Sequence, residues 1–161
     1  IERGKGLETV FDAYHRIKSQ RLADLVLMGK QLMDIPDIPG IKYVGFVPEE
    51  EKLSAFKGAV LSLQPSPLES LSITTLESFS QKTPVLVNHH CHVLREHVDL
   101  SGGGLSYQNP DQLVDNFRTL YDNRKMRKQM GRKGYDYVKN YFSWQAVTDV
   151  IKHEIGKLLK P

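Results

Sequence analysis

Short apolar runs alternate with helical patterns along most of this 161-residue chain. Each run is too short for a helix and is bounded by turn residues, which is typical of buried strands. Strands that alternate with helices predict an α/β domain with a doubly wound, Rossmann-like parallel sheet. The predicted strands cover residues 24–28, 41–44, 59–63, 84–87 and 105–107.

Amphipathic patterns predict helices between and after these runs. One helix is expected to be capped by Ser70 or Ser72 and to run to about Gln81. A short helical stretch is expected behind the loop of residues 88–92. The remaining predicted helices cover residues 7–17, 48–58, 111–121, 124–140 and 144–159.

Composition limits the classes of protein to which the chain can belong. A content of 40% hydrophobic and 25% charged residues is ordinary for one globular domain, here residues 1–161. A net charge of +3 without a dense basic tract argues against binding to nucleic acid. The basic residues 124–133 are interpreted as a solvated helix face, with weak attachment to anionic lipid as the alternative.

Cys91 is the chain's one cysteine, which excludes an intrachain disulfide and favours a reducing compartment. No apolar run approaches the roughly 18 residues that a membrane-spanning helix needs. We therefore expect a cytoplasmic protein. The chain opens with Ile1 and not with Met, and we expect it to be a fragment of a longer protein.

Ligands of parallel α/β sheets bind outside the carboxyl ends of the strands, so the loops that follow the predicted strands are the candidates. The loop of residues 64–77 follows a strand and opens a helix. The free N–H groups and partial positive charge of a helix start suit a phosphate. Glu69 and Glu77 lie about two helical turns apart, so they can reach different parts of one ligand. Read alone, they would be ordinary solvated acids.

The sequence Pro-Ser-Pro-Leu-Glu-Ser-Leu-Ser-Ile-Thr-Thr-Leu-Glu at residues 65–77 closely resembles the two-glutamate signature of the family-four retaining glycosyltransferases, also called glycosyl transferases group 1. The resemblance covers nearly the whole chain, and only this segment is specific. It implies the C-terminal, donor-binding domain of a GT-B glycosyltransferase. Weaker motifs resemble the family in the same order, at residues 5–7, 25–29, 44–47, 82–87 and 142–144.

The resemblance implies roles for three charged residues. Glu77 would bind the ribose hydroxyls of the nucleotide, and Glu69 would contact the donor sugar. Lys5 would neutralise the charge that grows on the leaving diphosphate, so Glu69 and Lys5 are the predicted catalytic residues. Taken alone, Lys5 would be a solvated lysine in a turn.

The resemblance also implies ligand contacts through the backbone. The N–H groups of residues 70–72 would bind the sugar and diphosphate, and the loops after two of the strands would hold the base. The predicted substrate-binding residues, with Glu77, are Ser70, Leu71, Ser72, Gly29, Phe46 and Val47.

The chain departs from the family pattern in several ways. Ser70 and Ser72 stand where glycines are commoner. The family's Gly-Arg pair, its first and central strand of this domain, and its N-terminal acceptor-binding domain are not in this chain. We expect all three in the whole protein, and we expect this chain alone to be inactive.

A histidine-rich loop offers a rival kind of site, with residues 88–92 reading Asn-His-His-Cys-His and His97 following. Imidazole and thiolate groups bind zinc, but these are crowded without the usual spacing of ligands. Because the family's corresponding loop faces the donor, contact of a histidine with sugar or phosphate is favoured over a metal. No Asp-x-Asp motif is present to hold Mg²⁺ or Mn²⁺, so we expect no metal and no cofactor.

Two classes of function remain. The first is a donor-binding domain of a retaining, metal-independent transferase, which moves a sugar from a nucleotide diphosphate to a glycan or glycolipid, with the whole enzyme peripheral at the inner membrane face. The alternative is a non-catalytic nucleotide- or phosphate-binding module with a Rossmann-like fold. A sugar-nucleotide epimerase of GT-B architecture is disfavoured, because that family lacks the Glu-Ser-Leu-Ser segment. The sequence does not distinguish UDP, GDP and ADP donors.

Overall fold

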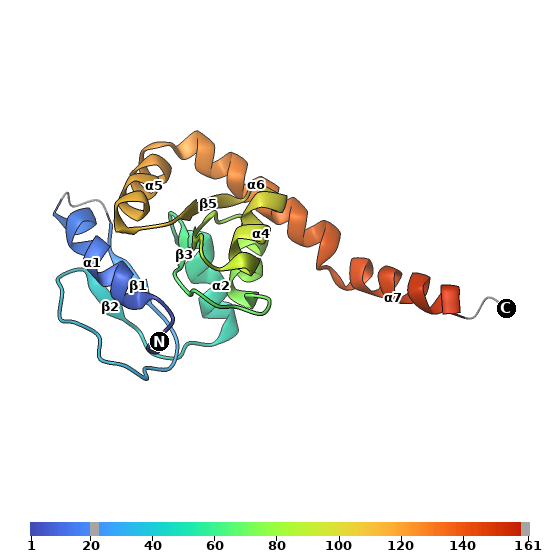
Figure 1. Ribbon diagram of the computed structural model, residues 1–161, viewed down its shortest axis with the longest axis horizontal. Coiled ribbons are helices and arrows are strands. Elements are labelled where there is room, and N and C mark those ends of the chain that lie inside the picture. The colour runs from blue at the N-terminus through green and yellow to red at the C-terminus, as the bar shows by residue number, and fades with distance from the viewer. Residues whose placement is uncertain (20–22, 159–161) are drawn as a thin grey trace.

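The computed structural model describes residues 1–19 and 23–158 and has the predicted α/β architecture, with helices packed around parallel strands (Figure 1). The strands of the described chain are β1 (Leu25–Leu27), β2 (Ile41–Tyr43), β3 (Ser62–Gln64), β4 (Val85–Asn88) and β5 (Gly104–Tyr107). The helices are α1 (Leu7–Lys18), α2 (Glu49–Gly58), α3 (Ile73–Ser80), α4 (His92–Ser101), α5 (Pro110–Asp122), α6 (Arg124–Tyr141) and α7 (Trp144–Leu158).

All strand pairs are parallel, as predicted, but the strands are divided between two sheets. β1 pairs with β2, and the other sheet has the order β3-β4-β5. Within the described residues, β1 and β3 are not hydrogen-bonded to each other, and a cavity of about 910 Å³ lies between them.

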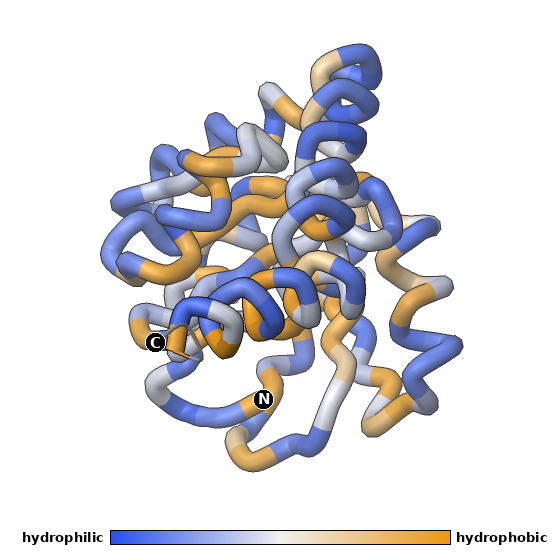
Figure 2. The backbone as a smooth tube through the Cα atoms, turned by 90° about the vertical axis from the view of Figure 1, so that its right-hand side faces the viewer, coloured by the Kyte–Doolittle hydropathy of each residue, from blue (hydrophilic) through white to orange (hydrophobic). Residues whose placement is uncertain are grey.

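Strand β4 organises the core because both of its faces are buried. Side chains alternate across a strand, so Leu86 faces one way and Val85 and Val87 face the other. Leu86 packs in a cluster with α1, β5 and α5, whereas its two neighbours pack in a second cluster with α3, α4 and α6. All three side chains have no exposed area. In Figure 2 the apolar stretches lie mostly inside and the outer turns of the helices are polar.

Several predicted boundaries needed correction. The strand predicted at residues 59–63 begins at Ser62, because pairing with β4 starts where the Ser62 N–H donates to the Pro84 carbonyl (2.9 Å). The short helical stretch expected after the histidine-rich loop is the ten-residue α4. The helix predicted at residues 144–159 is α7, and residue 159 lies outside the described residues.

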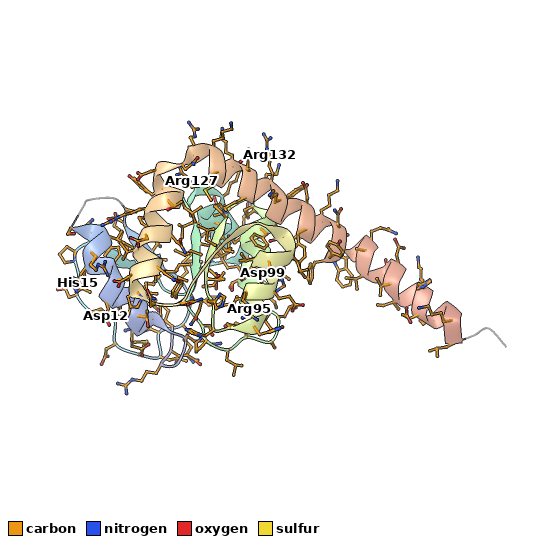
Figure 3. All side chains as sticks on the ribbon, turned by 45° about the horizontal axis from the view of Figure 1, so that its top comes forward. Asp12, His15, Arg95, Asp99, Arg127 and Arg132 are labelled. Atoms are coloured by element: carbon orange, nitrogen blue, oxygen red, sulfur yellow. The ribbon has the colours of Figure 1, made fainter. Side chains whose placement is uncertain are left out.

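Helix α6 lies close against α3 because two of its residues are glycines. Gly131 and Gly134 are buried, and a Cβ at either position would collide with the Lys82 carbonyl or with the Phe79 ring. The outer face of α6 carries exposed basic side chains such as Arg132 (Figure 3). Arg127 differs from them, because its guanidinium donates to the last carbonyls of α5.

Asp24 ties β1 to its neighbours on both sides. Its carboxylate pairs with Lys42 of β2 (2.8 Å) and with Lys18 of α1 (2.9 Å). The hydrogen bonds from Lys42 and Lys18 lower the pKa of Asp24 to about 2. The β1–β2 sheet is thereby attached to α1 by charged groups at its surface.

Helix α7 extends away from the rest of the molecule (Figure 1), and none of its described residues is buried. Its exposed apolar side chains include Trp144 and Ile151. Among the helices in the described part of the chain, none has the length and hydropathy needed to span a bilayer.

Candidate donor-binding site

The predicted ligand segment lies between β3 and α3, at the carboxyl ends of the strands of the larger sheet. Two hydrogen bonds fix the loop where it leaves β3. The Ser66 hydroxyl donates to the Leu68 carbonyl (2.8 Å), and the Asn88 side-chain amide at the end of β4 donates to the Pro65 carbonyl (3.0 Å). The role of Asn88 could not be predicted from the sequence, because this hydrogen bond joins residues 23 positions apart and leaves no local pattern.

Ser72 directly precedes α3, but its side chain does not cap the helix as predicted. Its backbone is left-handed, with φ 55° and ψ 68°, and a capping side chain needs an extended backbone. The Ser72 hydroxyl instead hydrogen-bonds to the Thr75 hydroxyl (2.9 Å), and neither Ser72 nor Ser70 makes a side-chain cap. A left-handed serine costs about 1–3 kcal/mol, so neighbouring contacts must hold this conformation.

The two predicted catalytic residues lie together. The Lys5 ammonium donates to the Glu69 carboxylate at 3.1 Å, with the Glu69 side chain 23% exposed. Gly6 makes this approach possible, because a Cβ there would collide with the Pro65 carbonyl and its φ is 76°. A partly exposed ion pair of this kind contributes only about 0–1 kcal/mol to stability, so it is a weak structural element.

Glu77 has a separate partner. Lys52 of α2 donates to Glu77 Oε1 at 2.6 Å, and the two side chains are 26% and 15% exposed. The other oxygen, Glu77 Oε2, is buried and has no hydrogen-bond partner among the described residues. Leaving a buried acceptor unsatisfied costs about 1–3 kcal/mol. Lys52 could not be found from the sequence, since no local pattern links it to Glu77 on a different helix.

The two loops predicted to hold the base lie side by side. The Gly29 N–H donates to the Gly45 carbonyl (2.8 Å), and the Tyr43 hydroxyl donates to the Gly29 carbonyl (2.9 Å). Phe46 is 85% exposed and Val47 is half-buried, so both are open to a ligand.

The cavity between the sheets overlaps this site only in part. Its lining is mostly apolar, and it includes the polar residues Lys5, Lys52 and Glu69. The other predicted residues lie outside its lining, because the cavity is chiefly the space between β1 and β3. They are Glu77, Ser70, Leu71, Ser72, Gly29, Phe46 and Val47.

The histidine-rich loop is held by ordinary hydrogen bonds. His89 Nδ1 pairs with the Ser106 hydroxyl (3.1 Å), and His90 Nε2 with the Gln108 carbonyl (3.2 Å). Cys91 is buried, and His97 lies apart on α4. Within residues 1–19 and 23–158, no group of three or more His, Cys, Asp or Glu side chains is placed to hold a metal ion.

The sequence model of one family, Glycosyl transferases group 1, matches residues 1–137. The chain belongs to this family of glycosyltransferases. Membership agrees with the two-glutamate segment, which lies inside the matched residues.

Solved structures of glycosyltransferases share the fold of the chain. Sucrose-phosphate synthase from Thermosynechococcus elongatus superposes with a TM-score of 0.81 at 20% identity, over 97% of this chain and 43% of that one. HepE of Anabaena, in complex with UDP and glucose, has a TM-score of 0.80 at 15% identity, over 95% and 45%. The catalytic domain of the cholesterol-α-glucosyltransferase from Helicobacter pylori has a TM-score of 0.67 at 21% identity, over 86% and 92%. The fold is that of the C-terminal domain of GT-B glycosyltransferases, and the chain spans less than half the length of the first two proteins.

Proposed function

We propose that this chain is the nucleotide-sugar donor-binding domain of a retaining, metal-independent glycosyltransferase that acts on a glycan or glycolipid acceptor. Family membership supports the reaction class. The shared fold of HepE, a protein solved with UDP and glucose, supports a nucleotide diphosphate sugar as the ligand.

The observation that carries this proposal is the unsatisfied Glu77 Oε2. Lys52 holds one oxygen of the carboxylate and so orients the group, while the second oxygen is left without a partner among the described residues. A ribose hydroxyl donates hydrogen bonds and would satisfy that oxygen. Glu77 is therefore assigned to the ribose.

Lys5 and Glu69 are assigned to the reacting end of the donor. In the free protein they neutralise each other at the mouth of α3. When the donor binds, the Lys5 ammonium pairs with the diphosphate and stabilises the negative charge that grows there as the glycosidic bond breaks. Glu69 is then free to accept hydrogen bonds from hydroxyls of the donor sugar. Lys5 and the free N–H groups at the start of α3 thus replace a metal ion in the proposed mechanism.

The rest of the reaction belongs to the whole protein. We expect an N-terminal acceptor-binding domain to close over this site and complete it. A cytoplasmic enzyme that is peripheral at the inner membrane face would meet a glycolipid acceptor there.

Calorimetric titration with UDP, GDP, ADP and their sugars, in buffer with and without EDTA, tests the proposal. One nucleotide series should bind, with EDTA leaving the affinity unchanged. Glu77→Ala should lower the affinities for the free nucleotide and for the sugar nucleotide by about tenfold, the effect of losing one good hydrogen bond to a charged group. Glu69→Ala should lower only the affinity for the sugar nucleotide.

Two outcomes would contradict this assignment. If both variants lost affinity for the nucleotide and the sugar nucleotide equally, the separate roles of Glu69 and Glu77 would be contradicted. Absence of binding below millimolar concentration, together with a whole protein that neither transfers nor hydrolyses any donor, would exclude the enzyme. Binding without any transfer by the whole protein would favour the alternative of a non-catalytic nucleotide-binding module.

A further inference from the structure

His97 is a buried residue to which the proposed function gives no role. It lies on α4, is 5% exposed, and joins two segments that are distant in sequence. Its Nε2 hydrogen-bonds to the Leu71 carbonyl at 2.8 Å, and its Nδ1 to the Tyr137 hydroxyl of α6 at 3.1 Å. The imidazole also packs edge-on against the rings of Tyr137 and Phe142, with centroids 5.8 Å apart in each case.

These two partners determine where the imidazole carries its proton. The Leu71 carbonyl can only accept, so Nε2 carries the hydrogen. In the neutral ring, Nδ1 then has a lone pair and accepts from the Tyr137 hydroxyl. Burial raises the pKa of Tyr137, which keeps its phenol protonated as this arrangement requires. His97 is therefore set up as a donor to Leu71.

The hydrogen bond to Leu71 fixes the direction of a neighbouring amide. The Leu71 carbonyl and the Ser72 N–H belong to one planar trans peptide unit, in which they point in opposite directions. Because His97 holds the carbonyl on the α4 side, the Ser72 N–H faces away from His97. Among the hydrogen bonds of residues 1–19 and 23–158, none has the Ser72 amide as donor, so this N–H has no acceptor in that part of the chain, although Ser72 as a whole is only 6% exposed.

The backbone conformation of Ser72 needs neighbouring contacts, such as the hydrogen bond from His97, to stabilise it. Ser72 has φ 55°, a conformation that glycine adopts freely and serine adopts with strain. Left to itself, the Leu71–Ser72 peptide would relax toward commoner dihedral angles and turn its amide away. The Ser72 side chain is held by its hydrogen bond to the Thr75 hydroxyl, and the Leu71 carbonyl is held by His97.

We infer that His97 is a positioning residue, which orients the Leu71–Ser72 peptide so that the Ser72 N–H is presented to the diphosphate of the nucleotide-sugar donor. The inference rests on the proposed function, since the diphosphate at the start of α3 is part of that proposal. His97 acts through the backbone and does not touch the donor. It differs in this from the direct contact that the sequence analysis expected of the histidine-rich loop.

Three variants of this chain and one control test the inference by calorimetry, with the nucleoside diphosphate that wild type binds and with the corresponding nucleoside. His97→Leu removes both hydrogen bonds but keeps an apolar side chain. It should lower the affinity for the diphosphate about tenfold, the effect of one misplaced N–H donor to a charged oxygen, and leave the affinity for the nucleoside unchanged. His97→Gln, whose amide N–H reaches about as far as Nε2, should restore most of the loss. His15→Gln replaces an exposed histidine of α1 (Figure 3) and should change neither affinity.

Tyr137→Phe is the third variant. It keeps the imidazole of His97 but removes the hydroxyl that donates to its Nδ1. It should lower diphosphate affinity in the same direction by a smaller factor, and it covers the case in which His97→Leu does not fold. The inference is overturned if His97→Leu or Tyr137→Phe lowers the affinities for diphosphate and nucleoside equally, or changes neither. It is also overturned if His97→Gln loses as much diphosphate affinity as His97→Leu does. Wild type that binds no nucleoside diphosphate would overturn the proposed function and the inference with it. Wild type that binds, with no selective loss in the variants, would overturn the inference alone.

Discussion

At the scale of single residues, the site consists of polar side chains that are each matched to one partner far away in the sequence. Lys5 pairs with Glu69, and Lys52 pairs with Glu77. The first pair is partly exposed, whereas the second is more buried and leaves one carboxylate oxygen of Glu77 without a partner among the described residues. The two acids therefore differ in environment as well as in position.

Lys52→Met provides a test of the second pair. Removing the ammonium leaves the Glu77 carboxylate mostly buried and without its cation, so the free energy of unfolding should fall by about 1–3 kcal/mol. Urea denaturation at neutral pH measures the change. Adding Glu77→Gln to Lys52→Met removes the unpaired charge and should recover part of the loss. A single variant as stable as wild type would show that the pair is not coupled in this way.

At the scale of elements, the position of the ligand segment depends on how closely the helices behind it pack. Helix α3 carries Glu77 and begins directly after Ser72, and α6 covers α3 through the two buried glycines. The same α6 supplies Tyr137, the partner of His97. The packing of α6 therefore supports both the C-terminal end of α3 with the turn after it and, through Tyr137, the hydrogen bond from His97 to Leu71.

Gly131→Ala should separate these two helices. The added methyl group would collide with the Lys82 carbonyl, so either α6 or the end of α3 must move. We expect a loss of about 1–3 kcal/mol in the free energy of unfolding, the usual cost of overpacking. Gly156→Ala is the matched control, because an added Cβ at that helical glycine on α7 would have no atom of the described residues within 4 Å.

Denaturant titration of both glycine variants decides the point. The Gly156→Ala protein should be unchanged or more stable by up to about 1 kcal/mol, since alanine is the better helix former. Equal midpoints for Gly131→Ala and wild type would mean that the close approach of α6 to α3 does not constrain the fold.

At the scale of the whole molecule, the chain combines a packed body with parts that are less well covered. The β3–β4–β5 sheet is enclosed by α3, α4, α5 and α6, whereas a cavity separates it from the β1–β2 sheet. Helix α7 extends from the body with its apolar side chains exposed. The candidate donor-binding site comprises Lys5 next to α1, the loops that follow β1, β2 and β3, and helix α3 with Glu77.

Ending the chain at Ser143 tests the independence of α7. None of the described residues of α7 is buried, so their removal should change the free energy of unfolding of the body by less than about 1 kcal/mol. Chains with and without this helix can be compared by urea denaturation. A large fall in the midpoint for the shorter chain would show that α7 stabilises the core after all.

The sequence predicted most of the secondary structure, because the periods of apolar residues reflect which faces become buried. The apolar run at β4 predicted a buried strand, and all its apolar side chains are buried. Boundaries were less predictable: β3 begins at Ser62 because of its pairing with β4, which is a contact between segments. The capping prediction for Ser72 was wrong for the same kind of reason, since its left-handed backbone is held by Thr75 and, through Leu71, by His97.

The family and the segment that carries Glu69 and Glu77 could be found from the sequence alone, because the residue types and spacing of a short continuous segment can be recognised without knowledge of the fold. The partners of those residues could not be found in this way. Lys52, Asn88 and His97 contact residues 65–77 from three other elements, and only packing brings them there. Local sequence limits which conformations each segment can adopt, but a hydrogen bond between distant segments depends on the position of both in space, and that position results from the fold as a whole.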